Sequence, residues 1–202
     1  IPFISVNHMR AHVLSHFIDE PKPPFPFLCL TVSGGHTQIV LVKSGTDMEV
    51  LGQTLDDAAG EAFDKSGKIL GLPYPAGPLI NRMAREGKPI YPFPIPQVDG
   101  LDFSFSGIKT AILYFIRDEV KKDPAFIETH LHDICASIQH VIVEILVRKV
   151  SLAAQLYNIS HIGIAGGVAA NSGLRTRLTE TGKELGWNLY FPAMQYCTDN
   201  AG

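Results

Sequence analysis

The sequence has little cysteine, no long apolar run and no basic leader. Its three cysteines are odd in number and far apart, which favours free thiols in a reducing compartment over a disulfide framework. The nearest candidate for a membrane span, residues 141–147, is interrupted by Glu144 and falls far short of the roughly 18 apolar residues that a spanning helix needs. No basic start followed by an apolar run marks a signal peptide. We therefore expect a cytoplasmic protein with no membrane contact.

Charged residues are also few, at 18%, while hydrophobic residues make up 46%, and this balance excludes a disordered chain. The formal net charge is −3, so any contact with nucleic acid requires a local basic patch. A length of 202 residues suffices for one core, or for one domain and part of another. Because the chain has no initiator Met, we expect it to be a piece of a longer protein.

Periodicity and turn residues predict an α/β protein. Three strands are expected to form an antiparallel meander, and helices and further strands follow it. Asn7 is the expected N-cap of the first helix, and Thr54 with Asp57 forms a capping-box arrangement for the second. The expected strands are 1–6, 27–32, 38–42, 48–53, 161–165 and 187–191, and the expected helices are 8–17, 54–70, 79–86, 106–121, 125–157 and 172–185.

This order of elements is typical of a ribonuclease-H-like lobe, the half-molecule unit of the actin-like (ASKHA) ATPases. We assign residues 1–20, with a strand and a histidine-bearing helix, to the end of a first lobe. Residues 27–202 are assigned to a second lobe that is truncated at its C-terminus, and the proline-rich stretch 21–26 is a linker.

Two histidines on the first helix are candidate metal ligands. A spacing of four places His8 and His12 on one helix face, close enough to share one metal ion. A zinc protease of this pattern needs Glu directly after the first His, and here that residue is Met9. Asp199 is a possible carboxylate ligand or an ordinary turn residue. The alternative for the histidines is an accidental spacing of two surface or core side chains.

Two glycine-containing segments are candidate ligand sites. In residues 33–37 (Ser-Gly-Gly-His-Thr), successive main-chain N–H groups can form an anion nest, although Gly-Gly also suits an ordinary hairpin turn. In residues 164–171, two glycines end a buried strand and a helix begins, which is where open α/β sheets bind ligands. Asn171 can cap that helix or present its amide to a ligand, and the two roles are compatible.

Three acids follow the meander at helical spacing. Asp57, Glu61 and Asp64 repel one another unless hydroxyl donors, an amine or a metal neutralises them. The alternative is a solvated acidic face that complements the helix N-terminus, which accounts for Asp56 and Asp57 but not for Asp64.

Taken together, these motifs and three others form an ordered set that covers nearly the whole chain. The set closely resembles the TsaD family of tRNA threonylcarbamoyladenosine enzymes, long labelled O-sialoglycoprotein endopeptidase or glycoprotease. The motifs are His8-Met-Arg-Ala-His12, Val32-Ser-Gly-Gly-His-Thr37, Asp56-Asp-Ala-Ala-Gly-Glu-Ala-Phe-Asp-Lys65, Tyr74-Pro-Ala-Gly-Pro78, Phe103-Ser-Phe-Ser-Gly-Ile-Lys109, Ala165-Gly-Gly-Val-Ala-Ala-Asn171 and Cys197-Thr-Asp-Asn200.

The resemblance implies a two-lobed actin-like enzyme that transfers threonylcarbamoyl from threonylcarbamoyl-AMP to N6 of adenosine 37 in tRNAs reading ANN codons. It implies that His8, His12 and Asp199 hold one divalent metal ion, iron or zinc. The implied partners are tRNA, a TsaB-like paralogue and a TsaE-like small ATPase. The residues implied to line the adenylate site are Thr31, Val32, Ser33, Gly34, Gly35, Asp64, Gly77 and Asn171.

This chemistry agrees with the residues. A metal polarises the carbonyl of the mixed anhydride, and a nest at residues 33–35 stabilises the leaving phosphate. Five basic residues could meet tRNA phosphates or could form a solvated face, and they are Lys65, Lys68, Arg82, Arg85 and Lys88.

Two departures from the family pattern matter. Ala76 stands where the family usually has Gly, and most of the first lobe is missing, so we expect this chain alone to be inactive. The rival hypotheses are a metal-dependent glycoprotease, which Met9 and the cytosolic profile disfavour, and a non-catalytic scaffold like the family's own paralogue, which a retained metal triad disfavours.

Overall fold

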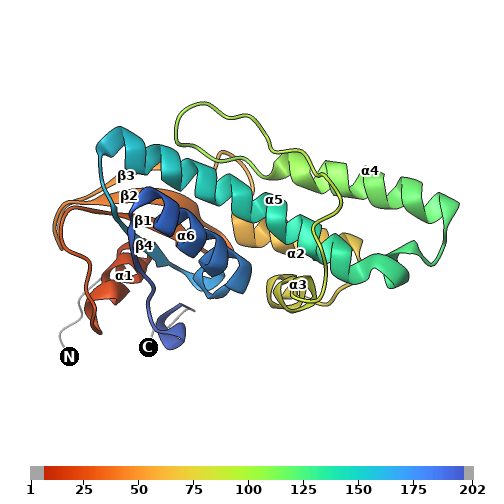
Figure 1. Cartoon of the computed structure of the whole chain (residues 1–202), viewed down its shortest axis with the longest axis horizontal. Coiled ribbons are helices and arrows are strands. Elements are labelled where there is room, and N and C mark those ends of the chain that lie inside the picture. Colours follow the sequence, from red (N-terminus) through yellow and green to blue (C-terminus); the bar gives the residue numbers. More distant parts are fainter. Residues whose placement is uncertain (1–6, 198–202) are drawn as a thin grey trace.

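The computed structural model describes residues 7–197 and contains a five-stranded sheet with helices on both faces (Figure 1). The strand order is β3-β2-β1-β4-β5. The first three strands pair antiparallel as the predicted meander, while β4 pairs parallel to β1 and β5 parallel to β4. The strands are β1 (Phe27–Val32), β2 (Thr37–Val42), β3 (Met48–Gln53), β4 (His161–Ala165) and β5 (Asn188–Tyr190). The strand expected at residues 1–6 lies outside the described residues.

The central strand β1 separates two hydrophobic clusters. Every residue of β1 is buried, because β2 and β4 flank it and helices cover both of its faces. Leu28 and Leu30 face a large cluster shared with α5 (Phe126–Tyr157), whereas Phe27 and Cys29 face a smaller cluster with Val13 of α1 (His8–Leu14). The alternation of side chains along a strand therefore divides one apolar run between two cores.

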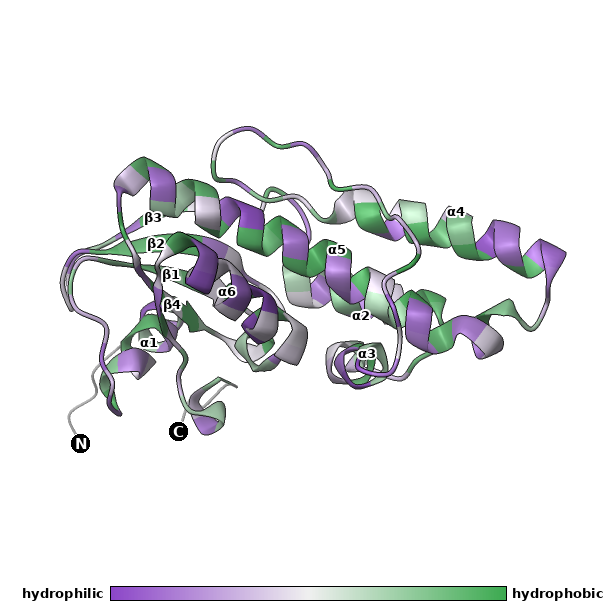
Figure 2. Cartoon of the chain, viewed as in Figure 1, coloured by the Kyte–Doolittle hydropathy of each residue, from purple (hydrophilic) through white to green (hydrophobic). Residues whose placement is uncertain are grey.

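The remaining helices form a second layer that extends beyond the sheet (Figure 1). Figure 2 shows the strands largely apolar, while the viewer-facing side of α6 is largely polar. The helices of this layer and of the sheet ends are α2 (Ala59–Ile69), α3 (Ala76–Ala84), α4 (Ser106–Lys122) and α6 (Ser172–Leu185), with 3-10 turns η1 (Ser15–Phe17), η2 (Gly167–Ala170) and η3 (Met194–Tyr196). None of the helices within residues 7–197 has the length and apolar character needed to cross a bilayer.

Two predicted helix caps are confirmed. The Asn7 side chain accepts a hydrogen bond from Arg10 N at the start of α1, and the Asn171 side chain accepts one from Leu174 N at the start of α6. The three cysteines are free, as expected, and all three are buried.

The predicted capping box at Thr54 is wrong. The helix α2 begins at Ala59, because residue 54 still belongs to the sheet: Thr54 N donates to Thr37 O, and Thr54 forms a bridge with Phe103. The first helical amide, Ala59 N, instead donates to the Thr37 hydroxyl at 2.9 Å. The cap of α2 thus comes from β2, a residue 22 positions earlier in the chain.

Candidate functional site

A pocket of about 320 Å³ lies where the carboxyl ends of the parallel strands β1 and β4 meet. Ligands of open α/β sheets bind at this edge, because both strands release their following loops there. The two loops approach closely: Gly166 has φ +90°, and a Cβ at this position would lie 2.4 Å from Val32 O. The pocket is lined by Gly34, Gly60, Phe63, Asp64, Tyr74, Pro75, Gly77, Pro78, Asn81, Gly167, Val168, Ala170 and Asn171.

The turn after β1 is both a hairpin turn and an open row of amides. Ser33 N donates to His36 O at 2.8 Å, and the Ser33 hydroxyl accepts from His36 N at 3.1 Å. Gly34 and Gly35 are exposed, and within residues 7–197 their amides donate to no other group. The amides that an anion nest requires are therefore available, and the hairpin interpretation and the nest interpretation are compatible.

The helix α2 packs directly against this turn at Gly60. Gly60 N donates to Ser33 O at 3.3 Å, and a Cβ on Gly60 would lie 2.6 Å from the same oxygen. A residue with a side chain at this position would displace the turn, so the small residue sets the position of the Gly34 and Gly35 amides.

The four acids of the Asp56–Lys65 motif all have partners, and two of them share one lysine. Lys65 Nζ lies 2.5 Å from the Asp57 carboxylate and 2.8 Å from Glu61, and these hydrogen bonds raise the pKa of Lys65. The amine anticipated for the acidic cluster is therefore Lys65. This pairing makes the lysine a poor candidate for contact with a tRNA phosphate.

Asp64 and Asp56 cap helices that come later in the chain. Asp64 Oδ1 accepts from Ala76 N at 2.7 Å and Gly77 N at 3.4 Å, at the start of α3. Asp56 accepts four hydrogen bonds at the start of α4, from the Ser104 hydroxyl, Phe105 N, Ser106 N and the Ser106 hydroxyl. Partial burial would raise the pKa of Asp56, but these hydrogen bonds outweigh burial and lower it.

The structure brings four of the eight predicted adenylate-site residues to the pocket wall, namely Gly34, Asp64, Gly77 and Asn171. The other four do not line this pocket: Thr31 and Val32 are fully buried within β1, and Ser33 and Gly35 lie in the turn that follows it. The sequence interpretation missed Phe63, Asn81 and Tyr74 as lining residues. Tyr74 was within a motif already noted, and its side chain is 85% exposed at the pocket rim.

Ala76, where the family usually has Gly, fits its surroundings. Its side chain is buried against α2, and a Cβ added to Gly67 would lie only 2.2 Å from the Ala76 methyl carbon. Because Gly67 of α2 has no side chain, it leaves the space that the Ala76 methyl group of α3 occupies.

The two candidate metal ligands on α1 are neighbours. The rings of His8 and His12 have centroids 4.6 Å apart in an edge-to-face arrangement, with His8 exposed and His12 buried. This juxtaposition suits two imidazoles sharing one ion. Asp199 lies outside the described residues, so the predicted carboxylate ligand stays a prediction. Within residues 7–197, no three His, Cys, Asp or Glu side chains converge on a metal position.

The segment that precedes Asp199 is tied to the pocket by Arg175. The guanidinium Nε donates to Ala169 O in η2 at 2.6 Å, and Nη2 lies 3.4 Å from Pro192 O and 3.6 Å from Cys197 Sγ. Burial raises the pKa of the Cys197 thiol, and the nearby Arg175 charge opposes this in part. One side chain thus links the loop after β4 to the residues that lead to Asp199.

The fold is that of one lobe of the actin-like ATPase fold, as predicted. Full-length HypF, solved in a phosphate- and nucleotide-bound form, matches with a TM-score of 0.69 at 15% identity over 98% of this chain and 34% of that one. Component A of the (R)-2-hydroxyglutaryl-CoA dehydratase of Acidaminococcus fermentans matches with a TM-score of 0.54 at 17% identity over 96% and 61% of the two chains. At these identities the likeness shows the fold alone.

The chain belongs to the TsaD family, because the family model "tRNA N6-adenosine threonylcarbamoyltransferase" matches residues 1–202. A relative of that name from Christiangramia forsetii is 57% identical over 205 residues, covering all of this chain and 60% of its own. Another, from Cytophaga hutchinsonii, is 54% identical over 202 residues, covering all of this chain and 59% of its own. The chain therefore spans about 60% of the length of these relatives.

Proposed function

We propose that the full-length protein is a tRNA-modifying transferase, which moves threonylcarbamoyl from threonylcarbamoyl-AMP to N6 of adenosine 37 in tRNAs reading ANN codons. This chain supplies the adenylate pocket of that reaction. The observation that carries the proposal is the convergence of separate family motifs on one cavity of about 320 Å³ at the ends of β1 and β4.

In the proposed reaction, the N6 amine of adenosine attacks the carbamoyl carbon of the mixed anhydride. The bond from that carbon to the phosphate oxygen breaks, AMP leaves with the electron pair, and the N6 proton passes to solvent. The exposed Gly34 and Gly35 amides are the groups that would bind the leaving phosphate and stabilise the charge that develops there. The exposed ring of Tyr74 at the rim offers a stacking surface to an adenine base.

His8, His12 and Asp199 are the residues that would hold a divalent iron or zinc ion, whose chemistry there would be polarisation of a carbonyl oxygen. Arg175 supports both halves of the proposed site, because it binds the loop after β4 and the segment before Asp199. A cytoplasmic location, a TsaB-like paralogue and a TsaE-like small ATPase complete the proposal.

The test is transfer of labelled threonylcarbamoyl from threonylcarbamoyl-AMP to a tRNA transcript by the full-length protein with both partners. Label should enter a transcript with adenosine 37 and not one with guanosine 37. Absence of transfer to either transcript would refute the proposed function. The 202-residue chain should show no turnover under matched conditions, and equal turnover would contradict that expectation.

A matched pair of glycine variants tests the amide nest. A Cβ at Gly34 or at Gly45 would meet no atom within 4 Å, so a side chain at either position begins in open space. Gly34→Val should reduce transfer by at least tenfold because the side chain shields the anion-binding amides, while Gly45→Val, in the remote β2–β3 turn, should not. Equal activity of the two variants would remove the nest from the mechanism.

A further inference from the structure

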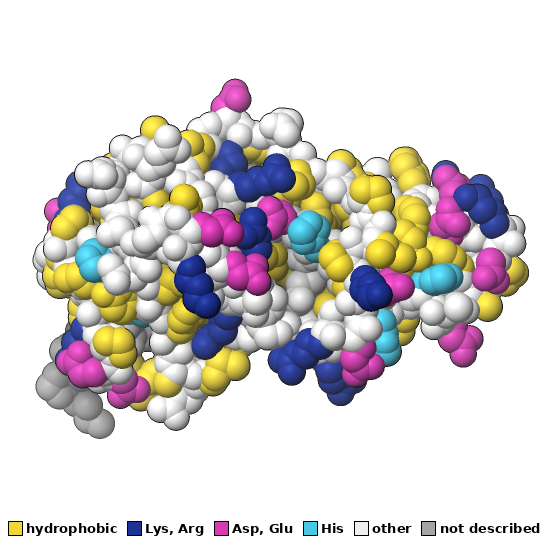
Figure 3. All heavy atoms as spheres, viewed as in Figure 1, with side chains coloured by type: hydrophobic (Ala, Val, Ile, Leu, Met, Phe, Trp, Pro, Cys, Tyr) yellow, Lys and Arg dark blue, Asp and Glu magenta, His cyan; other side chains and the backbone are white. Residues whose placement is uncertain are grey.

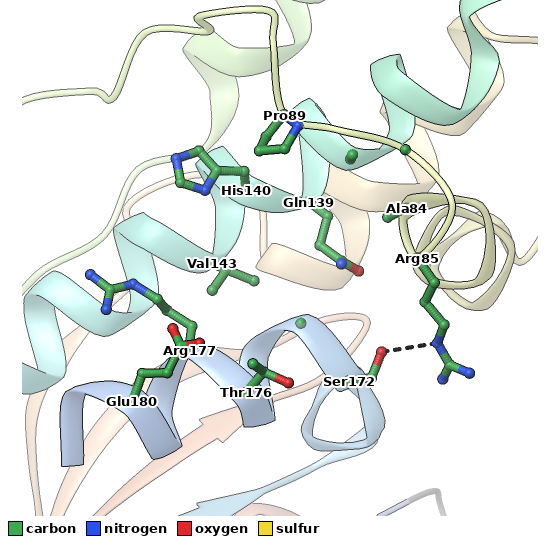
Figure 4. Close-up of a pocket in the computed structure, with 13 residues that line it drawn as sticks. Ala84, Arg85, Pro89, Gln139, His140, Val143, Ser172, Thr176, Arg177 and Glu180 are labelled. Carbon is green, nitrogen blue, oxygen red and sulfur yellow. Dashed lines mark hydrogen bonds between the residues drawn. The ribbon is translucent and has the colours of Figure 1, made fainter. Parts of the chain in front are cut away.

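A second hollow, of about 330 Å³, lies behind the wall of the adenylate pocket. It is bounded by the end of α3, the middle of α5 and the first turns of α6 (Figure 4). Figure 4 shows Arg85 and Arg177 on opposite sides of the hydroxyl-bearing Ser172 and Thr176, with His140 on α5 above Arg177. We call this cavity the α3–α6 hollow. None of the residues that line it also lines the adenylate pocket.

The Arg85 guanidinium is held in place and still has donors to spare. Its Nε donates to the Ser172 hydroxyl at 3.2 Å, which fixes the plane of the group at the edge of the hollow. Within the described residues, its two terminal nitrogens make no further hydrogen bond. A guanidinium fixed by one bond and open at its fork suits a phosphate oxygen pair.

The opposite wall carries a second guanidinium in a paired state. Arg177 Nε donates to Glu144 at 2.6 Å and Nη1 to the Thr181 hydroxyl at 3.1 Å. Glu180 also lines the hollow, so its lining holds an acid as well as two guanidiniums. With Glu144 counted, two acids balance the two guanidiniums, and Arg85 is the one of the two that forms no ion pair within the described residues. One unpaired guanidinium suits one phosphodiester rather than a polyphosphate. Figure 3 shows the same face, where Lys and Arg side chains gather over α3 and α6 with acidic side chains among them.

The hollow and the adenylate pocket share one hydrogen-bonded wall. Ser172 N and its hydroxyl both donate to Asn81 Oδ1, at 3.1 and 2.8 Å, and Asn81 lines the adenylate pocket. Asn171 Nδ2 donates to Gln139 Oε1 at 2.8 Å, which joins the two cavities a second time. The first amide of α6 is therefore already occupied, and the proposed anion contacts are made by side chains.

The spacing of the two cavities matches a strand of nucleic acid. Asn81 on α3 and Arg85, the C-cap residue of α3, lie four residues apart, which is on the order of 6 Å along the helix axis. A stacked strand rises roughly 3.4 Å per nucleotide, so this separation is about two nucleotide steps. A strand that presents the N6 amine of one base to the anhydride bound at the adenylate pocket would pass Arg85 with the phosphate of a near neighbour.

We propose that the α3–α6 hollow binds a backbone phosphodiester of the tRNA next to the modified nucleotide, with Arg85 as its main contact. This inference rests on the proposed function. It assigns Arg85 to substrate positioning and leaves Lys65, which is paired with two acids, outside the tRNA contact.

The experiment compares Arg85→Gln with Lys121→Gln in the full-length protein with its partners. The glutamine at 85 keeps a donor for Ser172 and removes the charge, and Lys121 is an exposed control at the far end of α4. Filter binding of a tRNA transcript is measured from 50 to 300 mM salt. Arg85→Gln should weaken binding about fivefold to tenfold near 0.1 M salt and reduce the slope of log K against log salt by about one.

Four further readouts decide the result. The KM for threonylcarbamoyl-AMP and the unfolding midpoint should not change in Arg85→Gln, and Arg85→Lys should restore the salt slope. Inorganic phosphate at 5 mM should not compete with tRNA, and competition would instead indicate a site for a small anion. Equal losses in the 85 and 121 variants, or no loss in either, would overturn the inference. Because tRNA binding is measured without turnover, a failure of the proposed transfer reaction would be seen separately.

Discussion

Replacing Gly60 by alanine tests whether close packing of α2 holds the ligand turn in place. The added Cβ would lie 2.6 Å from Ser33 O and 2.8 Å from Gly34 Cα, whereas ordinary contacts begin near 3.4 Å. The turn must therefore move by roughly 0.8 Å, and overpacking of this kind costs about 1–3 kcal/mol. Alanine regains up to about 1 kcal/mol of helix propensity, so a net loss of about 1–2 kcal/mol is expected.

The matched control is Gly107→Ala. Gly107 is the second residue of α4, as Gly60 is of α2, but a Cβ there meets only Pro96 Cγ at 3.8 Å. The control should keep or slightly raise the free energy of unfolding because it gains propensity without a clash.

Urea unfolding followed by circular dichroism measures the free energy of unfolding, and calorimetric titration measures the affinity of the pocket for AMP. Gly60→Ala should lower the free energy of unfolding by the amount given above. It should also lower the affinity for AMP by at least fivefold, since the displaced turn carries the Gly34 and Gly35 amides. If Gly60→Ala matches Gly107→Ala in stability and in AMP affinity, the turn is not positioned by this contact and the reasoning fails.

Three further predictions concern buried and capping groups. Burial lowers the pKa of His16 to about 4, with the main chain of Ile164 opposing in part, so the unfolded chain binds a proton that the folded chain does not between pH 6.5 and 4. The free energy of unfolding should therefore fall by about 3 kcal/mol over that range as the pH drops. His16→Leu should flatten this part of the pH profile, and parallel profiles of the two proteins would contradict the assignment to His16. Glu144→Gln should cost about 1–2 kcal/mol in urea unfolding, because Glu144 is buried and paired with Arg177, while Glu119→Gln, in a surface pair, should cost under about 0.5 kcal/mol; equal costs would sink the argument. Asp64→Ala should lose about 1–2 kcal/mol and Asp64→Asn much less, because an amide oxygen can still cap α3; identical losses would show that the cap contributes nothing.

Local patterns predicted most of the elements correctly. The strands at 27–32, 48–53 and 161–165 and the helix at 172–185 have the predicted bounds, because apolar runs, alternation and caps act over only a few residues. The predicted helix start at Thr54 was wrong for the complementary reason. A pairing of Thr54 with Phe103, far along the chain, outweighed the local capping signal.

The candidate site divides in the same way. Glycine pairs at two strand ends predicted two turns that border the pocket, since a turn that exposes amides is a local property. The roles of the acids were not predictable, because the partner of each acid either lies far along the chain or is one of several candidates nearby. Asp56 accepts hydrogen bonds at the start of α4, Asp64 accepts them at the start of α3, and Asp57 pairs with Lys65.

The sequence by itself determined the family, the secondary structure and the buried strands, because motifs, periodicity and caps are written in neighbouring residues. Only the tertiary structure decided three features: which donors pair with each acid, the capping of α2 by a residue of β2, and the wall that Asn81 and Ser172 form between two cavities. Most of those outcomes depend on hydrogen bonds between residues 12 to 91 positions apart, whose geometry exists only once the helices have packed on the sheet.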